Sequence, residues 1–324
     1  MKRKIAAGFI AICLAAGFVG CEKAADAEKA NTPETETASI DVIMKTTDSE
    51  YWSQVEAGAK AAGKDLGVNV DVKGTPSEDL TAEQANLLKA DIESKAYDAY
   101  VVAPCSPQIS DVIEGYRYPF IAMDTNIEAE EVVSFVGTDN ETAAKAAGAA
   151  AVEAAKAAGW DNIEAICIAG VPGDTASEAR KAGFTAGVKE AGASCLDKEY
   201  YTNGHGETAI DAINAVMNDY PEGVAIVFCN NDEMAMAAAL QAKENKAYEN
   251  TIFVGFDGIA SGCVSIKDGI LNLSVSQEAY EMGYTAVETA VKALNDEEVE
   301  ATIYTSFQII DASNADARLE ELKK

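Results

Sequence analysis

Apolar and polar residues alternate in two patterns from position 40 onward. Short uncharged runs, rich in β-branched and aromatic side chains, are typical of strands covered on both faces of a parallel sheet. Longer stretches between them repeat apolar residues every three or four positions, which is typical of helices packed on such a sheet. The runs predicted as strands are 40–44, 68–72, 98–103, 119–124, 132–137, 163–170, 195–202 (a polar edge strand), 224–228, 253–256, the start of 271–280, and 303–310.

Regular alternation of strands and helices predicts βαβ units, and therefore an α/β protein with parallel sheets. The chain has 324 residues, which is long enough for two lobes with separate cores. In open α/β sheets, ligands bind at the carboxyl ends of the strands. Polar or aromatic residues follow the predicted strands at Ser49, Tyr51, Trp52, Asp124, Asn231 and Asp257. We therefore expect these side chains to form one ligand site.

Three motifs carry a family resemblance when they are taken together. They are GVPGDTASEAR at 170–180, NNDEMA at 230–235 and VGFDG at 254–258. Together they resemble the ribose- and galactose-binding group of type I periplasmic binding proteins, which serve ABC transporters. The resemblance spans roughly residues 39 to 310 and implies two Rossmann-like lobes joined by a three-strand hinge.

The resemblance also implies where the lobes divide. The chain would cross between lobes near Thr138, near Gln277 and at 304–306. Residues 39–138 and 278–304 would then form the N-terminal lobe, and residues 139–277 and 305–324 the C-terminal lobe. A ligand bound between the lobes would favour closure, because only the closed form contacts it from both sides.

The resemblance assigns roles to the candidate residues. Asp124, Asp257 and Asn231 would bind sugar hydroxyls, and Arg180 would bind oxygen atoms and offset the carboxylates. Gln277 and Ser49 would complete the rim, Asp174 falls where another polar ligand residue is common, and Tyr51 and Trp52 would stack. These side chains suit a sugar, because aromatic rings pack on its C–H face and carboxylates accept from its hydroxyls.

Each assignment has an alternative in which no ligand is involved. Tyr51 and Trp52 could simply be the apolar start of a helix, Asp124 could cap a turn, and Arg180 could be a surface cation. The family's aromatic on the second sugar face aligns with Gly206, so either His205 or a nearby tyrosine covers the ligand, or the pocket is more open. His205 could also be an exposed loop residue.

The N-terminus has the features of an export signal. Lys2, Arg3 and Lys4 precede an apolar run at 5–19 that ends in Gly20 and Cys21. This run is shorter than the ~20 residues that span a bilayer, so residues 1–20 are predicted to be a signal peptide. Phe18 to Cys21 resembles a lipoprotein cleavage box, so Cys21 would carry a lipid that anchors the protein to the membrane; secretion without a lipid is the alternative. Residues 21–38 would be a disordered tether, because they have almost no bulky apolar side chain.

Charge and cysteine content narrow the functions further. The formal net charge is −29, and loss of three basic residues with the signal takes it to −32. Such a polyanion is a poor partner for nucleic acid. Five cysteines follow Cys21, at 105, 167, 195, 229 and 263, with no CxxC pair. They predict neither a disulfide framework nor a metal site.

Residues 204–209 fit the weak dinucleotide pattern G-x-G-x-x-A, but the strand before them is polar, and no Walker loop or G-x-S-x-G motif is present. We therefore expect a monomeric, cofactor-free binding protein rather than an enzyme. It would capture a pentose or hexose outside the cytoplasm and deliver it to the permease of an ABC importer. The alternatives are a sensor of a sugar, cyclitol or signal molecule that feeds a chemoreceptor or histidine kinase, and an exported enzyme.

Overall fold

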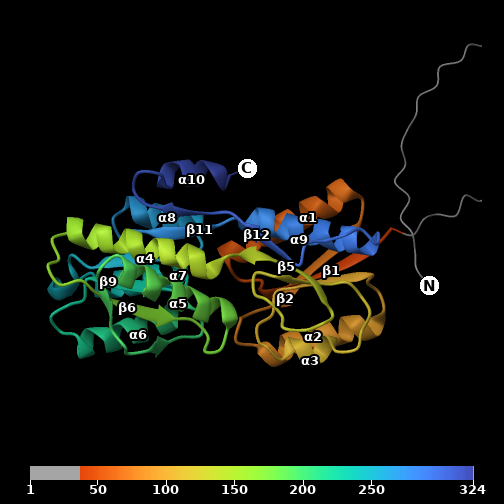
Figure 1. Cartoon of the computed structure of the whole chain (residues 1–324), viewed down its shortest axis with the longest axis horizontal. Coiled ribbons are helices and arrows are strands. Elements are labelled where there is room, and N and C mark those ends of the chain that lie inside the picture. The colour runs from red at the N-terminus through yellow and green to blue at the C-terminus, as the bar shows by residue number, and fades with distance from the viewer. Residues whose placement is uncertain (1–36, 324) are drawn as a thin grey trace, which may run out of the picture.

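The computed structural model describes residues 37–323, which form two α/β lobes side by side (Figure 1). The predicted signal peptide 1–20, the predicted lipidation site Cys21 and residues 22–36 of the predicted tether lie outside the described residues. The α/β fold with two parallel sheets, predicted from the strand–helix alternation, is confirmed.

The first lobe is built on a six-stranded parallel sheet in the order β12-β5-β4-β3-β1-β2. Its strands are β1 (Ser39–Thr46), β2 (Asn69–Thr75), β3 (Ala99–Val102), β4 (Phe120–Met123), β5 (Val132–Thr138) and β12 (Thr302–Thr305). Successive side chains of β1 point to opposite faces, so Val42 and Met44 pack in one core cluster and Ile43 in another. Both faces of the sheet are therefore covered, as the uncharged strand runs predict.

Two pairs of helices cover these faces. They are α1 (Glu50–Leu66) with α9 (Ala279–Leu294), and α2 (Thr81–Ser94) with α3 (Ile109–Ile113). The backbones of α1 and α9 touch at two glycines: a Cβ on Gly58 would lie 1.9 Å from the Tyr280 carbonyl oxygen, and one on Gly283 would lie 2.1 Å from that of Val55. This close approach fixes α9, which comes late in the chain, on the first lobe.

The second lobe is built on a five-stranded parallel sheet. Its strands are β6 (Glu164–Ala169), β7 (Ser194–Cys195), β8 (Tyr200–Tyr201), β9 (Ile226–Cys229) and β10 (Ile252–Val254). Helices α4 (Asn140–Ala157) and α5 (Thr175–Glu190) cover one face, and α6 (Gly206–Asp219), α7 (Asp232–Ala242), α8 (Ala260–Lys267) and α10 (Ala315–Glu321) belong to the core on the other. A short 3-10 helix, η1 (Lys246–Tyr248), precedes β10.

The prediction of one continuous strand over 195–202 is wrong, although β7 does lie at the edge of the sheet. The segment forms two separate short strands, β7 and β8, and both pair in parallel with β6. Between them the chain leaves the sheet, and the side chains of Lys198 and Tyr200 bind Asp219 at the end of α6. Two of the polar side chains in this segment therefore bind a residue of α6.

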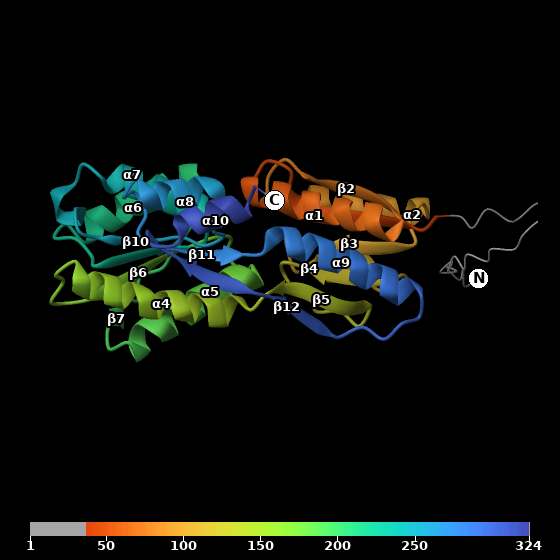
Figure 2. The ribbon, with the colours of Figure 1, turned by 90° about the horizontal axis from the view of Figure 1, so that it is seen from above.

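The chain passes from one lobe to the other at three places. β5 ends at Thr138 before α4; β11 (Ser274–Gln277) is followed by α9; and β12 is followed by β13 (Phe307–Ile310). β11 and β13 pair antiparallel beside the second sheet. The three connections run together between the lobes (Figure 2). Within residues 37–323, no helix is long and apolar enough to cross a membrane.

Candidate functional site

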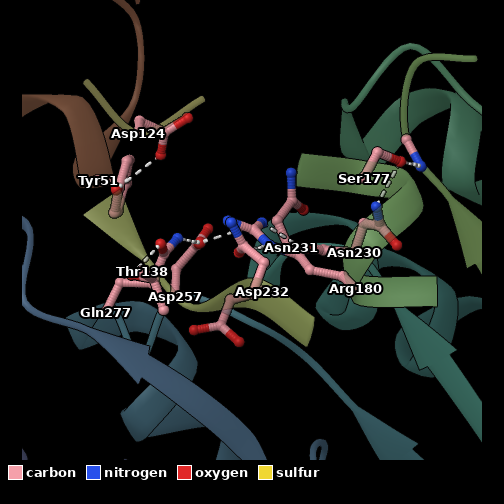
Figure 3. Close-up of polar contacts among 12 residues, drawn as sticks. Tyr51, Asp124, Thr138, Ser177, Arg180, Asn230, Asn231, Asp232, Asp257 and Gln277 are labelled. Atoms are coloured by element: carbon pink, nitrogen blue, oxygen red, sulfur yellow. Dashed lines mark hydrogen bonds and ion pairs between the residues drawn. The ribbon is translucent and has the colours of Figure 1, made fainter. Parts of the chain in front are cut away.

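A cavity of about 610 Å³ lies between the lobes, where the carboxyl ends of strands from both sheets meet. All nine residues predicted from the sequence line it: Ser49, Tyr51, Trp52, Asp124, Asp174, Arg180, Asn231, Asp257 and Gln277. Residues from positions 49 to 277 thus converge in one place. Figure 3 shows the core of this site, with Tyr51 and Asp124 facing Asp257, Gln277 and Arg180.

Asp124 follows β4 and is held by partners on several sides. Its φ of 64° is a left-handed conformation that an aspartate adopts at a cost. Its Oδ1 accepts from the Tyr51 hydroxyl at 2.9 Å, and its Oδ2 accepts from the Thr125 hydroxyl at 3.0 Å. The ammonium nitrogen of Lys45 lies 3.3 Å from Oδ2. Asp124 therefore lines the cavity with most of its acceptor positions filled from within the protein.

Lys45 is a central residue of the site that the sequence analysis missed. It lies near the end of β1, and its Nζ is 3.1 Å from Oδ2 of Asp174, in the other lobe. Burial alone would lower the pKa of Lys45, but the carboxylates of Asp174 and Asp124 raise it above its ordinary value. Burial likewise opposes ionisation of Asp174, yet Lys45 brings the pKa of Asp174 below its ordinary value. The cross-lobe pair is therefore charged.

Asp257 follows β10 and has fewer partners than Asp124. Its Oδ1 accepts from Gln277 Nε2 at 2.7 Å, and Gln277 Oε1 accepts from the Thr138 hydroxyl at 2.8 Å. The closest guanidinium nitrogen of Arg180 is 3.8 Å away. Burial raises the pKa of Asp257 well above its ordinary value, and Arg180 offsets this only in part. Asp257 thus has acceptor capacity that a ligand hydroxyl could fill.

Arg180 is buried and not a surface cation, so that alternative is wrong. Its Nε donates to Asn140 Oδ1 at 2.7 Å and its Nη1 donates to the Asn230 carbonyl oxygen at 2.9 Å. Its guanidinium carbon lies 4.0 Å from the centroid of the Phe256 ring. These contacts fix the cation toward the cavity, where it faces Asp257.

Asn231 and Asp174 each cap the helix that follows them. Asn231 Oδ1 accepts from the Met234 N–H at 2.8 Å, and its Nδ2 donates to the Gly204 carbonyl oxygen at 2.8 Å. Asp174 Oδ1 accepts from the Ser177 N–H at 2.7 Å. Such caps satisfy backbone donors that a helix leaves free at its N-terminus. The caps therefore hold these two side chains at the cavity wall.

Tyr51 and Trp52 belong both to the first lobe's core and to the cavity wall. They are 6% and 2% exposed, and their ring centroids are 5.2 Å apart in an edge-to-face arrangement. Trp52 Nε1 donates to Glu78 Oε1 at 3.1 Å, which adds a carboxylate that the sequence analysis did not identify. The two rings therefore form the apolar start of α1 and part of the cavity wall at the same time. Ser49 stands at the N-cap position of α1.

Gly206 opens α6 where the family resemblance implies an aromatic residue. A Cβ on Gly206 would lie 3.2 Å from Ala237 Cβ and 3.4 Å from the Glu233 carbonyl oxygen, so a side chain at this position would start in close contact with α7. His205 beside it is half-buried, and its Nε2 lies 2.8 Å from the Ser77 hydroxyl of the first lobe. The exposed-loop reading of His205 is therefore wrong, and this residue joins the two lobes.

Comparison with known proteins agrees with this architecture. Residues 40–298 match the family described as "Periplasmic binding protein domain", and the chain belongs to this family. The chain is 27% identical over 263 residues to the D-allose-binding periplasmic protein of Escherichia coli (strain K12), covering 78% of this chain and 83% of that protein. It is 25% identical over 290 residues to the ribose import binding protein RbsB of Bacillus subtilis (strain 168), covering 87% and 90%.

A solved structure is similar as well. It is a carbohydrate transporter solute binding protein from Agrobacterium radiobacter in complex with D-arabinose, with a TM-score of 0.80 and 28% identity. The match covers 89% of this chain and 99% of that chain. The family resemblance read from the three sequence motifs is confirmed.

Proposed function

We propose that this protein captures a neutral monosaccharide, a pentose or a hexose, between its lobes and delivers it to an ABC importer. The relatives support a sugar: two are named for D-allose and ribose, and a similar structure was solved with D-arabinose. The geometry supports a ligand enclosed by both lobes, with hydroxyl-binding groups on either side. The nine predicted residues are our candidates for its contacts.

The charge of the cavity supports a neutral ligand. Two fixed cations, Lys45 and Arg180, face seven carboxylates: Asp48, Glu50, Glu78, Asp124, Asp174, Glu233 and Asp257. A phosphorylated or acidic sugar would meet a surplus of like charge without enough cations to offset it. We therefore expect uncharged sugars and polyols to bind in preference to sugar phosphates and sugar acids.

Asp257 carries the proposal, because it is a cavity carboxylate, 12% exposed, with unfilled acceptor positions. A ligand hydroxyl donating to it would make a charge-assisted hydrogen bond, which is roughly twice as strong as a neutral one. Asp257→Ala should weaken binding by about 1–3 kcal/mol, or roughly 5- to 150-fold. The matched control is Asp161→Ala, an exposed aspartate that does not line the cavity.

The test has two stages. A thermal-shift screen of pentoses, hexoses and polyols identifies a ligand, since one present at 100 times its Kd stabilises the protein by about 2.7 kcal/mol. Titration calorimetry then compares wild type, Asp257→Ala and Asp161→Ala with that ligand. Unchanged affinity in Asp257→Ala would remove this residue from the site, and no shift with any member of the screen would refute the proposed ligand class.

The proposed location is the outer face of the cell membrane, with Cys21 lipidated after removal of residues 1–20. The basic start, short apolar run and Gly20-Cys21 junction of the sequence support this, as does membership of a periplasmic binding family. We expect a monomer on the anchor. Cys21→Ser should release the protein from the membrane fraction, because the lipid is the proposed attachment.

A further inference from the structure

Lys45 brings together one carboxylate from each lobe. Its side chain is 8% exposed, and its ammonium lies 3.3 Å from Asp124 of the first lobe and 3.1 Å from Asp174 of the second. Its backbone is also fixed, because its carbonyl oxygen accepts from the Thr75 hydroxyl at 2.6 Å. The cation therefore occupies a defined position in the cavity wall.

This position changes what Asp124 can offer a ligand. A carboxylate accepts about four hydrogen bonds. Tyr51 and Thr125 already supply two of them to Asp124, and the Lys45 ammonium forms an ion pair with Oδ2 at 3.3 Å. Asp124 therefore has fewer free positions for two adjacent sugar hydroxyls than a sugar-binding carboxylate usually provides.

The ammonium offers a ligand a donor instead of an acceptor. It has three N–H donors: one donates to Asp174 Oδ2 at 3.1 Å, and Asp124 Oδ2 lies within ion-pair distance. A remaining N–H can donate to a ligand oxygen, either a hydroxyl or a ring oxygen. An ammonium in the ligand would instead meet the donor-only ammonium of Lys45 and find no acceptor on it.

We propose that Lys45 is a specificity-determining residue, which joins Asp124 and Asp174 across the lobes and selects ligands that place an acceptor oxygen beside it. This inference rests on the proposed function. It predicts selection for one particular oxygen of a neutral sugar and rejection of the analogue with an amino group at that position.

The main experiment is calorimetry with a set of related ligands. The sugar that binds wild type most tightly is compared with each of its single-deoxy and amino analogues, on wild type, Lys45→Met and Lys45→Ala. Lys60→Met is the control, since Lys60 is an exposed lysine of α1 paired with Glu56 and does not line the cavity.

We expect Lys45→Met to bind the parent sugar about 10- to 100-fold more weakly, which is the size expected for a lost hydrogen bond to a charged group. One deoxy analogue that wild type rejects should bind Lys45→Met as well as the parent does. In Lys45→Ala, the amino analogue at the same position should bind better than the parent, because its ammonium replaces that of Lys45. A uniform loss over all analogues in both variants would overturn the selection role and leave only a structural one.

A second measurement does not depend on a sugar. Small-angle scattering of the ligand-free protein should give a larger radius of gyration for Lys45→Met and for Asp174→Asn than for wild type and Lys60→Met. Asp174→Asn keeps the Lys45–Asp124 pair, so it remains informative if Lys45→Met folds poorly. Unchanged radii in folded variants would overturn the cross-lobe role.

The binding screen and the variants together distinguish a wrong role for Lys45 from a wrong ligand class. If wild type binds no sugar in the screen, the proposed function fails and the selection role fails with it, while scattering still decides the cross-lobe role. If wild type binds sugars but the variants lose all analogues equally, only the inference about Lys45 fails.

Discussion

Asp124 and Asp257 stand at equivalent places in the two lobes but in different surroundings. Each follows a strand of its sheet, lines the same cavity and has a positive φ, 64° and 123° respectively. Asp124 has a lysine and two hydroxyls within hydrogen-bonding distance, whereas Asp257 has one amide and a guanidinium at 3.8 Å. The first carboxylate therefore stabilises the ligand-free protein, and the second destabilises it in a way that a ligand can relieve.

The largest expected effect is that of Asp124→Asn on stability. The substitution leaves the buried ammonium of Lys45 with one carboxylate and turns an amide toward it. Removing one partner of a buried ion pair costs about 3–5 kcal/mol. Urea unfolding of the ligand-free variant measures this loss, with Asp161→Asn as the exposed control. A loss under about 1 kcal/mol would mean that the two carboxylates do not differ as described.

Asp232 extends the comparison to a buried carboxylate that has only neutral donors. It accepts from the Ser274 hydroxyl and from the Ile259 N–H. Burial raises the pKa of Asp232 to about 7, and these hydrogen bonds offset the effect only in part. Between the unfolded pKa near 4 and the folded pKa, the folded state holds one more proton than the unfolded state.

The stability that Asp232 contributes should therefore be present at pH 4 and lost as the pH rises to 7. The slope is on the order of 1.4 kcal/mol per pH unit. Asp232→Asn removes the titrating group, so the free energy of unfolding of wild type minus that of the variant should fall across this window. Chemical denaturation at pH 4, 5.5 and 7 measures it. A constant difference would show that the carboxyl of Asp232 does not titrate there.

The smallest expected effect is a gain in stability from Asp257→Asn. The amide oxygen can still accept from Gln277, while the buried charge is removed. Burial raises the pKa of Asp257, so a larger fraction of this carboxyl is ionised in the folded protein at pH 8 than at pH 5. Its charge therefore destabilises the folded state more at pH 8. We expect the ligand-free variant to be about 1 kcal/mol more stable than wild type at pH 8, together with weaker sugar binding. Thermal unfolding without ligand measures the gain; a destabilised variant would contradict it.

The fold could be predicted from the sequence because its signals are local. The uncharged run at 224–228 and the helix after it appear in the structure as β9 and α7, with Asn231 as the cap. The side chains after each strand converge because the carboxyl ends of parallel strands share one edge of a sheet. That rule accounts for Asn231 and Asp257, whereas Asp174, Arg180 and Gln277 were placed in the site by the family resemblance.

The parts that could not be predicted depend on contacts distant in sequence. The strand at 40–44 was predicted to end before Lys45, and the partner Asp174 lies 129 residues away in the other lobe. Tyr51 and Asp124 are 73 residues apart, and nothing in the sequence shows that their bond occupies an acceptor of Asp124. The glycine at 206 in place of an aromatic was visible in the sequence, but its close approach to α7 was not.

The place of β12 beside β5 has a consequence for biosynthesis. This edge strand of the first sheet spans Thr302–Thr305, so the sheet that begins at Ser39 stays incomplete until the ribosome has passed Thr305. Proteins generally fold one domain at a time from the N-terminus during translation. Here most of the second lobe, up to β11, is translated while the first still exposes one unpaired edge of β5, a template for wrong pairing between nascent chains. Shielding that edge of β5 until β12 arrives would therefore limit wrong pairing during synthesis.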